Sequence, residues 1–260
     1  MIFRAFPLHP SENDQESAMS SKITIRSVVH QIDGQPYESR LVYDASATSS
    51  RPGLLMAPNW MGVSEGAEDI AKAVAEQGYV VLLADLYGQK IRPGNGDEAG
   101  EAMMPLKNDR ALLRKRMQAG LDLLLSQAGV SLDASRIATF GFCFGGCCSL
   151  ELARSGADLK AAISFHGTLD TPNPADAANI KGSVLILNGA SDPMVPKEQI
   201  SAFEEEMDAA SVDWQVHNYG GAYHSFTDPH ANVPGKMMYD AKVAGRAFKS
   251  MHDLLSEVFG

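Results

Sequence analysis

The sequence of 260 residues is poor in cysteine, and its three cysteines lie together. Cys143, Cys147 and Cys148 fall within six residues of one another, whereas a disulfide framework spreads an even number of cysteines along the chain. No second group of ligands at a zinc-site spacing accompanies them. We therefore expect reduced thiols in a cytoplasmic protein that uses neither a metal nor another cofactor.

The chain also has fewer basic residues than acidic ones. Lysine and arginine number 22 against 32 aspartate and glutamate residues, for a formal net charge of -10. Phosphate backbones and anionic lipids attract basic surfaces, so neither a nucleic acid nor a membrane is an expected partner. No apolar run is long enough to cross a bilayer, and residues 1–21 lack an apolar core of signal-peptide length. A small molecule is the expected partner of a monomer or homodimer.

Residues 1–21 are polar and show no hydrophobic period, which predicts a mobile N-terminal arm with Met19 as an alternative start. Residues 22–260 are expected to form a single domain. Period-two alternation at 23–29 and 37–43, around the turn Asp33-Gly34, predicts an antiparallel pair of strands at one edge of a sheet.

From residue 53 onward, short apolar runs alternate with amphipathic segments, which predicts an α/β fold with a mainly parallel central sheet and helices on both faces. The Gly- and Pro-rich stretch 85–105 is expected to be a long surface excursion and a candidate lid. The expected strands are 53–57, 79–84, 137–140, 161–165, 184–187 and 214–219, and the expected helices are 65–77, 109–128, 144–155, 197–210 and 236–258.

Residues 141–146 read GFCFGG and lie between a predicted strand and a predicted helix. This is the pattern of a nucleophile elbow, in which small residues two positions before and after the nucleophile let the chain turn sharply. Cys143 would be the nucleophile, at a helix N-terminus whose N–H groups favour a thiolate. The alternative is a buried structural thiol. Cys147 and Cys148 fall inside the helix, where small apolar residues pack.

Two further side chains follow predicted strands in the order that a nucleophile, acid and histidine take in this type of fold. Asp192 comes 49 residues after Cys143, and His224 comes 32 residues after Asp192. His224 would take the thiol proton, and Asp192 would orient the imidazole. The alternatives are a turn-capping Asp and a surface loop His.

A tetrahedral oxyanion needs two N–H donors. The N–H of Phe144 follows the nucleophile directly, and the N–H of Trp60 lies in the loop after the 53–57 strand. The alternative for Trp60 is simple packing against the lid. The candidate substrate pocket comprises Asn59, Tyr87, His166 and Phe226.

Together these motifs resemble the dienelactone hydrolase family of α/β-hydrolases. The matching pieces are PNWMGV, AEQGYVVLLADLYG, GFCFGG, GASDPMVP and GAYHSFTDP, in the family's order from about residue 53 to 250. The resemblance implies an α/β-hydrolase fold, a Cys-Asp-His triad on Cys143, Asp192 and His224, an oxyanion hole at Phe144 and Trp60, and no cofactor or metal.

The chain departs from the family pattern at two positions. Asn59 stands where the best-known members have a Glu that helps to control the resting thiol, and an amide cannot accept the thiol proton as a carboxylate can. Asp228 lies near the place of an Arg that binds the substrate carboxylate, and an Asp would repel such a group. Arg110 or Arg114 is an alternative anion clamp, unless both are solvated helix charges.

The expected function is therefore hydrolysis of small esters or lactones through a thioester acyl-enzyme, with a substrate that differs from the namesake's. One competing hypothesis is a thiol redox or peroxide sensor that uses Cys143 with Cys147. A second is a catalytically silent binding protein on the same fold.

Overall fold

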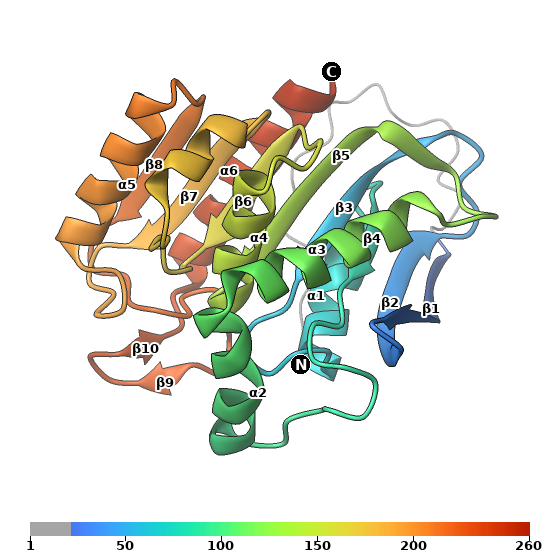
Figure 1. Cartoon of the computed structure of the whole chain (residues 1–260), viewed down its shortest axis with the longest axis horizontal. Helices are drawn as coiled ribbons and strands as arrows, with labels where there is room; N and C mark the ends of the chain where they lie inside the picture. The colour runs from blue at the N-terminus through green and yellow to red at the C-terminus, as the bar shows by residue number, and fades with distance from the viewer. Residues whose placement is uncertain (1–21) are drawn as a thin grey trace.

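The computed structural model describes residues 22–260, so the predicted arm and the alternative start Met19 lie outside the described residues. An eight-stranded sheet runs through the molecule in the order β1-β2-β4-β3-β5-β6-β7-β8 (Figure 1). The strands are β1 Ile23–Ile32, β2 Gln35–Asp44, β3 Arg51–Ala57, β4 Val80–Leu83, β5 Leu132–Phe142, β6 Ala161–Phe165, β7 Ser183–Gly189 and β8 Trp214–Tyr219.

Strands β1 and β2 pair antiparallel to each other, and β2 pairs antiparallel to β4. All later pairs in this sheet are parallel, from β4·β3 through β7·β8. The predicted parallel sheet with an antiparallel N-terminal edge is confirmed. Because the parallel strands all point the same way, the loops after β3, β5, β6, β7 and β8 gather at one edge.

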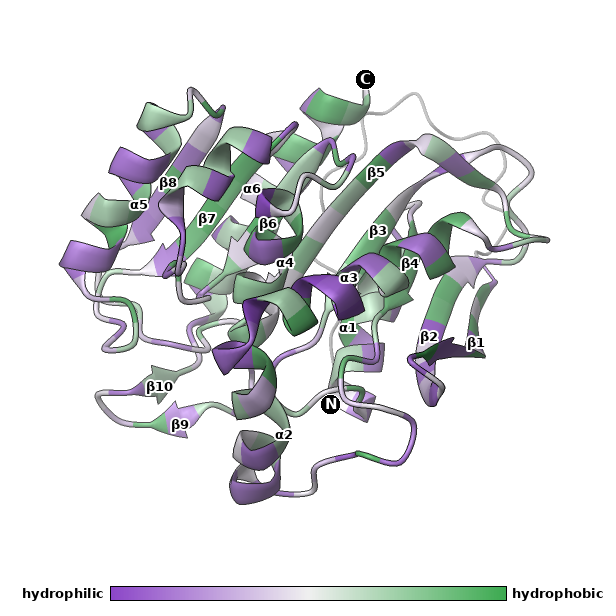
Figure 2. Cartoon of the chain, in the orientation of Figure 1, coloured by the Kyte–Doolittle hydropathy of each residue, from purple (hydrophilic) through white to green (hydrophobic). Residues whose placement is uncertain are grey.

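Helices cover both faces of the sheet, as predicted (Figure 1). Helices α1 and α6 pack on one face, and α3, α4 and α5 pack on the other. The central strands are mostly apolar, and every residue of β4 and β6 is buried between the two helical layers (Figure 2). The helices are α1 Glu65–Ala75, α2 Gly96–Asn108, α3 Arg110–Leu125, α4 Phe144–Arg154, α5 Lys197–Ala209 and α6 Ala241–Phe259.

Two sequence expectations need correction. The stretch 85–105 is not an irregular excursion throughout, because α2 begins at Gly96 with the Asn95 side chain as its N-cap. The last helix begins at Ala241, not at residue 236, because Met237–Met238 forms strand β10 and pairs with β9, Asn232–Val233. The short η1 helix, Pro174–Asn179, was also not foreseen.

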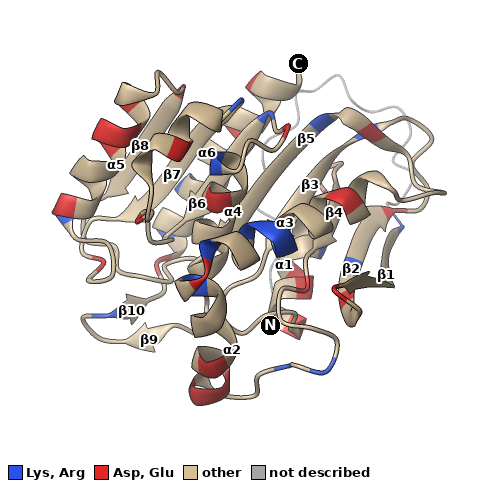
Figure 3. Ribbon diagram, in the orientation of Figure 1, with Lys and Arg blue, Asp and Glu red and all other residues tan. Residues whose placement is uncertain are grey.

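Helix α4, which begins directly after Cys143, is anchored by buried charges. The fully buried Arg154 guanidinium donates to both carboxylate oxygens of Glu206, at 2.8 and 2.7 Å, and to Glu151 at 3.1 Å. Arg114 of α3 donates to the other oxygen of Glu151 at 2.8 Å. These pairs join α4 to α3 and α5, and Figure 3 shows basic and acidic residues on these helices.

Replacing Arg154 by leucine should therefore destabilise the protein. The substitution leaves the carboxylates of Glu151 and Glu206 buried without their cation, which should lower the free energy of unfolding by about 3–5 kcal/mol. Urea denaturation measures this loss. The control is Lys249→Leu, which breaks an exposed pair with Asp253 and should change the stability far less. Equal losses for the two variants would contradict the anchoring role.

Candidate active site

The candidate nucleophile Cys143 occupies a sharp turn between β5 and α4. Its backbone has φ 55° and ψ −118°, a conformation that residues with a side chain rarely adopt. The turn is held by hydrogen bonds at the edge of the sheet, since the Cys143 N–H donates to the carbonyl of Phe165 at 2.9 Å. The thiol is partly exposed at the N-terminus of α4. This is the strand–turn–helix geometry that the motif GFCFGG predicts.

Close packing explains the glycines on either side of this turn. A Cβ on Gly141 would collide with the backbone of Gly145. A Cβ on Gly145 would collide with the carbonyl of Ala57 and lie 2.5 Å from that of Pro58. The elbow therefore rests directly on the loop that follows β3.

That loop carries Trp60 and is shaped by Asn59. The Asn59 side-chain oxygen accepts the Met61 N–H at 2.9 Å, and its backbone oxygen accepts the Gly62 N–H at 3.0 Å. Asn59 thus forms a turn in which its amide orders the backbone on either side of Trp60.

Tyr87 joins the two predicted oxyanion donors. Its hydroxyl donates to the Trp60 carbonyl at 2.9 Å, and its ring stacks on Phe144 at a centroid distance of 6.5 Å. Tyr87 is buried, and this burial raises the pKa of its hydroxyl, which stays protonated. Among the described residues, the N–H groups of Trp60 and Phe144 donate to no protein acceptor. Their oxyanion role stays a prediction.

Asp192 and His224 meet in a direct contact. The Nδ1 atom of His224 lies 2.7 Å from Oδ2 of Asp192, and both side chains are buried. The other Asp192 oxygen accepts the Met194 N–H at 2.8 Å, which fixes the carboxylate. The Nε2 atom of His224 is buried and has no hydrogen-bond partner among residues 22–260.

A segment missed by the sequence reasoning holds His224 in place. The backbone N–H of His224 donates to the Lys236 carbonyl at 3.2 Å, and its carbonyl accepts the Met238 N–H at 3.1 Å. His224 therefore joins β10 through an isolated bridge to Met237. The two residues of β10 are too short a run for a period-two signal in the sequence.

The charges around His224 favour its protonated form. Burial opposes the charge, but the hydrogen bond to Asp192 and the nearby Cys143 thiol outweigh it and raise the pKa of His224 to about 10. The structure thus brings Asp192 and His224 into direct contact. That Cys143 completes a triad with them stays a prediction.

Two of the four pocket candidates, His166 and Phe226, are buried close to His224. His166 follows β6 directly, and its ring centre lies 5.1 Å from that of His224. Phe226 is fully buried and packs on His166 at 5.0 Å, so it supports the site from within the core. With Asn59 and Tyr87 holding the loop of Trp60, all four candidates contact neighbouring parts of the site.

The two arginines considered as an anion clamp are not solvated helix charges. Arg110 donates to the Cys147 sulfur and to Asp170 at 2.8 Å, and Arg114 pairs with Glu151 and Asp176. Both guanidinium groups are therefore neutralised by carboxylates of this chain. Cys147 and Cys148 are fully buried, which raises the pKa of both thiols.

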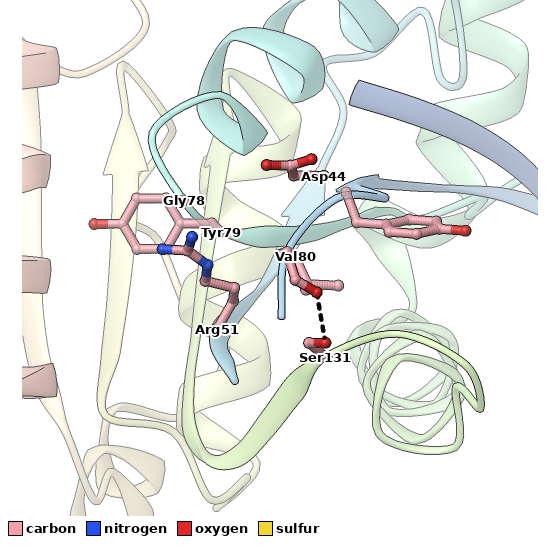
Figure 4. A pocket seen from close by; sticks show the side chains of 8 residues that line it. Asp44, Arg51, Gly78, Tyr79, Val80 and Ser131 are labelled. Atoms are coloured by element: carbon pink, nitrogen blue, oxygen red, sulfur yellow. Dashed lines mark hydrogen bonds between the residues drawn. The ribbon is translucent and has the colours of Figure 1, made fainter. Parts of the chain in front are cut away.

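A small depression lies at the opposite edge of the sheet, among the starts of β3, β4 and β5, with about 10 Å³ of space for water (Figure 4). That is room for about one water molecule and not for an organic substrate.

Residues 22–260 hold no cluster of three or more side chains of the kind that bind a metal ion. None of the helices in this part of the chain is long and apolar enough to cross a membrane.

The sequence profile of the dienelactone hydrolase family matches residues 40–259. The chain belongs to this family. An uncharacterised Caenorhabditis elegans protein, K02A2.1, is 38% identical over 154 residues, which cover 56% of this chain and 94% of that protein. A putative carboxymethylenebutenolidase of Salmonella typhimurium is 28% identical over 234 residues. The match covers 85% of this chain and 84% of that protein.

Solved structures agree with this assignment. The chain named m3DLH has a TM-score of 0.86 and 38% identity, and the match covers 92% of this chain and 99% of that one. A dienelactone hydrolase-like promiscuous phosphotriesterase from metagenomic libraries has the same TM-score and coverage with 37% identity. This dienelactone hydrolase family member is thus a hydrolase that acts on lactone or ester bonds, and its predicted α/β-hydrolase fold is confirmed.

The packing of Gly145 can be tested by its replacement with alanine. The added methyl group must push the elbow away from the loop of Trp60, and a displacement of about 1 Å should lower kcat/KM by about 100-fold. Ester hydrolysis by the purified variant measures this. Gly100→Ala is the control, because a Cβ on this helical glycine meets nothing within 4 Å. Wild-type kcat/KM in Gly145→Ala would contradict the close fit.

The raised pKa of His224 predicts a pH-dependent contribution to stability. A group whose pKa rises on folding stabilises the protein fully below its unfolded value, here 6.5, and loses this effect as the pH approaches about 10. Asp192→Asn removes the charge that favours the imidazolium. The stability difference between wild type and Asp192→Asn should shrink from pH 6.5 to pH 10, as urea denaturation at several pH values would show. A difference that grows over this range would contradict the assignment.

Proposed function

We propose that this protein hydrolyses small esters or lactones through a covalent thioester on Cys143. The observation that carries the proposal is the meeting of three loop residues at one edge of the sheet. Cys143 stands on a strained turn at a helix N-terminus, and His224 is held by Asp192 at 2.7 Å. The buried Nε2 of His224 has no partner among residues 22–260, which leaves it available to the thiol.

In the first half-reaction, the Cys143 thiolate attacks the carbonyl carbon of the substrate. The oxyanion that forms is stabilised by the N–H groups of Phe144 and Trp60. The intermediate then collapses, the carbon–oxygen ester bond breaks, and the proton on His224 Nε2 passes to the departing alkoxide. The products are a thioester on Cys143 and an alcohol, which stays tethered to the acyl group when the substrate is a lactone.

In the second half-reaction, neutral His224 takes a proton from water, and the hydroxide formed attacks the thioester carbon. The carbon–sulfur bond breaks, which releases the acid and returns the thiolate facing an imidazolium. Asp192 offsets the positive charge of His224 in this resting state. The raised pKa of His224 keeps its imidazole protonated, which supports its proposed role as the donor of the leaving-group proton.

The substrate is proposed to differ from that of the family's namesake. Asn59 uses its side-chain oxygen to order the loop of Trp60, which is a structural task and not proton transfer. Asp228 follows His224 in the same loop and adds a negative charge there, while Arg110 and Arg114 already pair with carboxylates. Neutral esters and lactones therefore suit the site better than substrates with a carboxylate.

A second substrate class is favoured by one relative. The promiscuous phosphotriesterase is 37% identical over 92% of this chain, and its name indicates hydrolysis of phosphotriesters. A phosphotriester is neutral and passes through a charged intermediate or transition state that two N–H donors can stabilise. Diethyl p-nitrophenyl phosphate is therefore a second candidate substrate.

The redox hypothesis fits the surroundings of the second thiol less well. Cys147 is fully buried on α4, and its sulfur accepts a hydrogen bond from Arg110. Cys143 and Cys147 sit one turn apart on a rigid helix, where disulfide geometry is hard to reach. The redox hypothesis also gives no reason for the direct contact between Asp192 and His224.

The proposal is tested with p-nitrophenyl acetate, diethyl p-nitrophenyl phosphate, and a panel of neutral and carboxylate-bearing lactones. Wild type should hydrolyse the neutral substrates, and acid quenching should trap the acyl group on Cys143 for detection by mass spectrometry. Cys143→Ala should lose turnover entirely, and Cys143→Ser should be slower because a hydroxyl lacks the thiolate's reactivity. Equal product release by wild type and Cys143→Ala would sink the proposal.

A further inference from the structure

A second histidine lies beside His224, and the proposed reaction does not use it. His166 follows β6 directly and is fully buried. Its backbone has φ 42°, uncommon for a residue with a side chain, and its N–H donates to the Leu187 carbonyl of β7 at 2.8 Å. Strained positions of this kind persist only where the surroundings hold them, and they gather at functional sites.

The contacts of the His166 ring are specific. Its Nε2 lies 2.8 Å from the Thr227 hydroxyl, and Thr227 is three residues after His224 on the same loop. The ring meets the ring of His224 nearly edge to face, with centres 5.1 Å apart and planes at 66°. Phe226 and Phe142 hold the remaining sides, at 5.0 and 6.1 Å. One imidazole thus contacts the His224 loop at two points.

The His166 ring is neutral in this position. Burial, followed by the positive charge of His224, holds the pKa of His166 well below its usual range. His224 is the titratable group that the ring faces, and His224 in turn is bound to Asp192. A neutral aromatic ring beside an imidazolium fixes its plane without adding a competing positive charge.

We propose that His166 and Thr227 form a brace that sets the orientation of the His224 ring, so that Nε2 faces the Cys143 sulfur. His166 is a positioning residue in this proposal, since it touches His224 and not the substrate. The hydrogen bond to Thr227 fixes the His166 ring, and the ring contact transmits this order to His224. The inference rests on the proposed function, because it assigns a partner to the same Cys143–His224 pair.

The test uses the alkylation of Cys143 by iodoacetamide, which reports the thiolate held by His224 without any ester substrate. Thr227→Val removes the hydroxyl and keeps the shape of the side chain, whereas Thr227→Ser keeps the hydroxyl. His166→Phe keeps a ring without the hydrogen bond, and His166→Gln keeps a side-chain nitrogen without the ring. Rates are measured from pH 5 to pH 10 by mass spectrometry, with Cys143→Ala as the blank.

Thr227→Val, His166→Phe and His166→Gln should each slow alkylation near neutral pH by about tenfold and shift its pH profile, since a misoriented imidazole holds the thiolate less well. Thr227→Ser should recover the wild-type rate and profile. A matched control is the His217–Ser250 pair between β8 and α6, where a histidine ring nitrogen also contacts a hydroxyl, at 3.0 Å. His217→Phe and Ser250→Ala should leave the alkylation profile unchanged.

The brace is overturned if folded Thr227→Val and His166→Phe lose thermal stability but keep the wild-type alkylation profile and kcat. It is also overturned if the His217 control changes the profile as much as they do. Failure of the proposed function gives a different result. Wild type would then hydrolyse no ester, while alkylation of Cys143 would still depend on His224, Thr227 and His166, and the brace would stand.

Discussion

The strained turn at Cys143 is the constraint on which the rest of the site depends. A side chain is held at φ 55° where β5 ends and α4 begins, and this is sterically unfavourable unless the surroundings enforce it. Gly141 and Gly145 allow the elbow to pack against the loop after β3 without a gap. The same close packing places the loop that carries Trp60 directly against the elbow that carries Cys143.

Buried ion pairs in the later turns of α4 hold this helix, and with it the elbow at its N-terminus. Glu151 and Arg154 lie about two and about three turns beyond the elbow, and they join α4 to its neighbouring helices through Arg114 and Glu206. Desolvated ion pairs add little net stability but fix geometry, because any shift leaves a charge unpaired. A helix that cannot slide holds its first residue in place, and that residue follows the proposed nucleophile directly.

The loops that bring Asp192 and His224 together depend on contacts between distant segments. Asp192 follows β7, His224 follows β8, and the small β9–β10 pair holds the His224 backbone. Both side chains are buried. Burial alone would lower the pKa of His224, but the hydrogen bond to Asp192 acts in the other direction, and the pKa is raised. Tyr87 and His166 are both buried rings with two contacts each in the site. Tyr87 contacts Trp60 and Phe144, and His166 contacts Thr227 and His224.

The sequence by itself determined the alternation of strands and helices, the elbow at GFCFGG and the order of Cys143, Asp192 and His224, because these follow from local periodicity, steric limits at glycine and chain order. It also allowed the family to be named from short motifs. Only the tertiary structure decided that Asn59 orders the loop of Trp60, that Phe226 lies in the core, and that Arg110 and Arg114 are paired. Helix α2 was missed because its glycines and Pro105 are typical of a loop, and strand β10 was missed because it is two residues long. The contacts of Asn59, Phe226 and the two arginines depend on how the folded chain packs, which no local pattern in the sequence encodes.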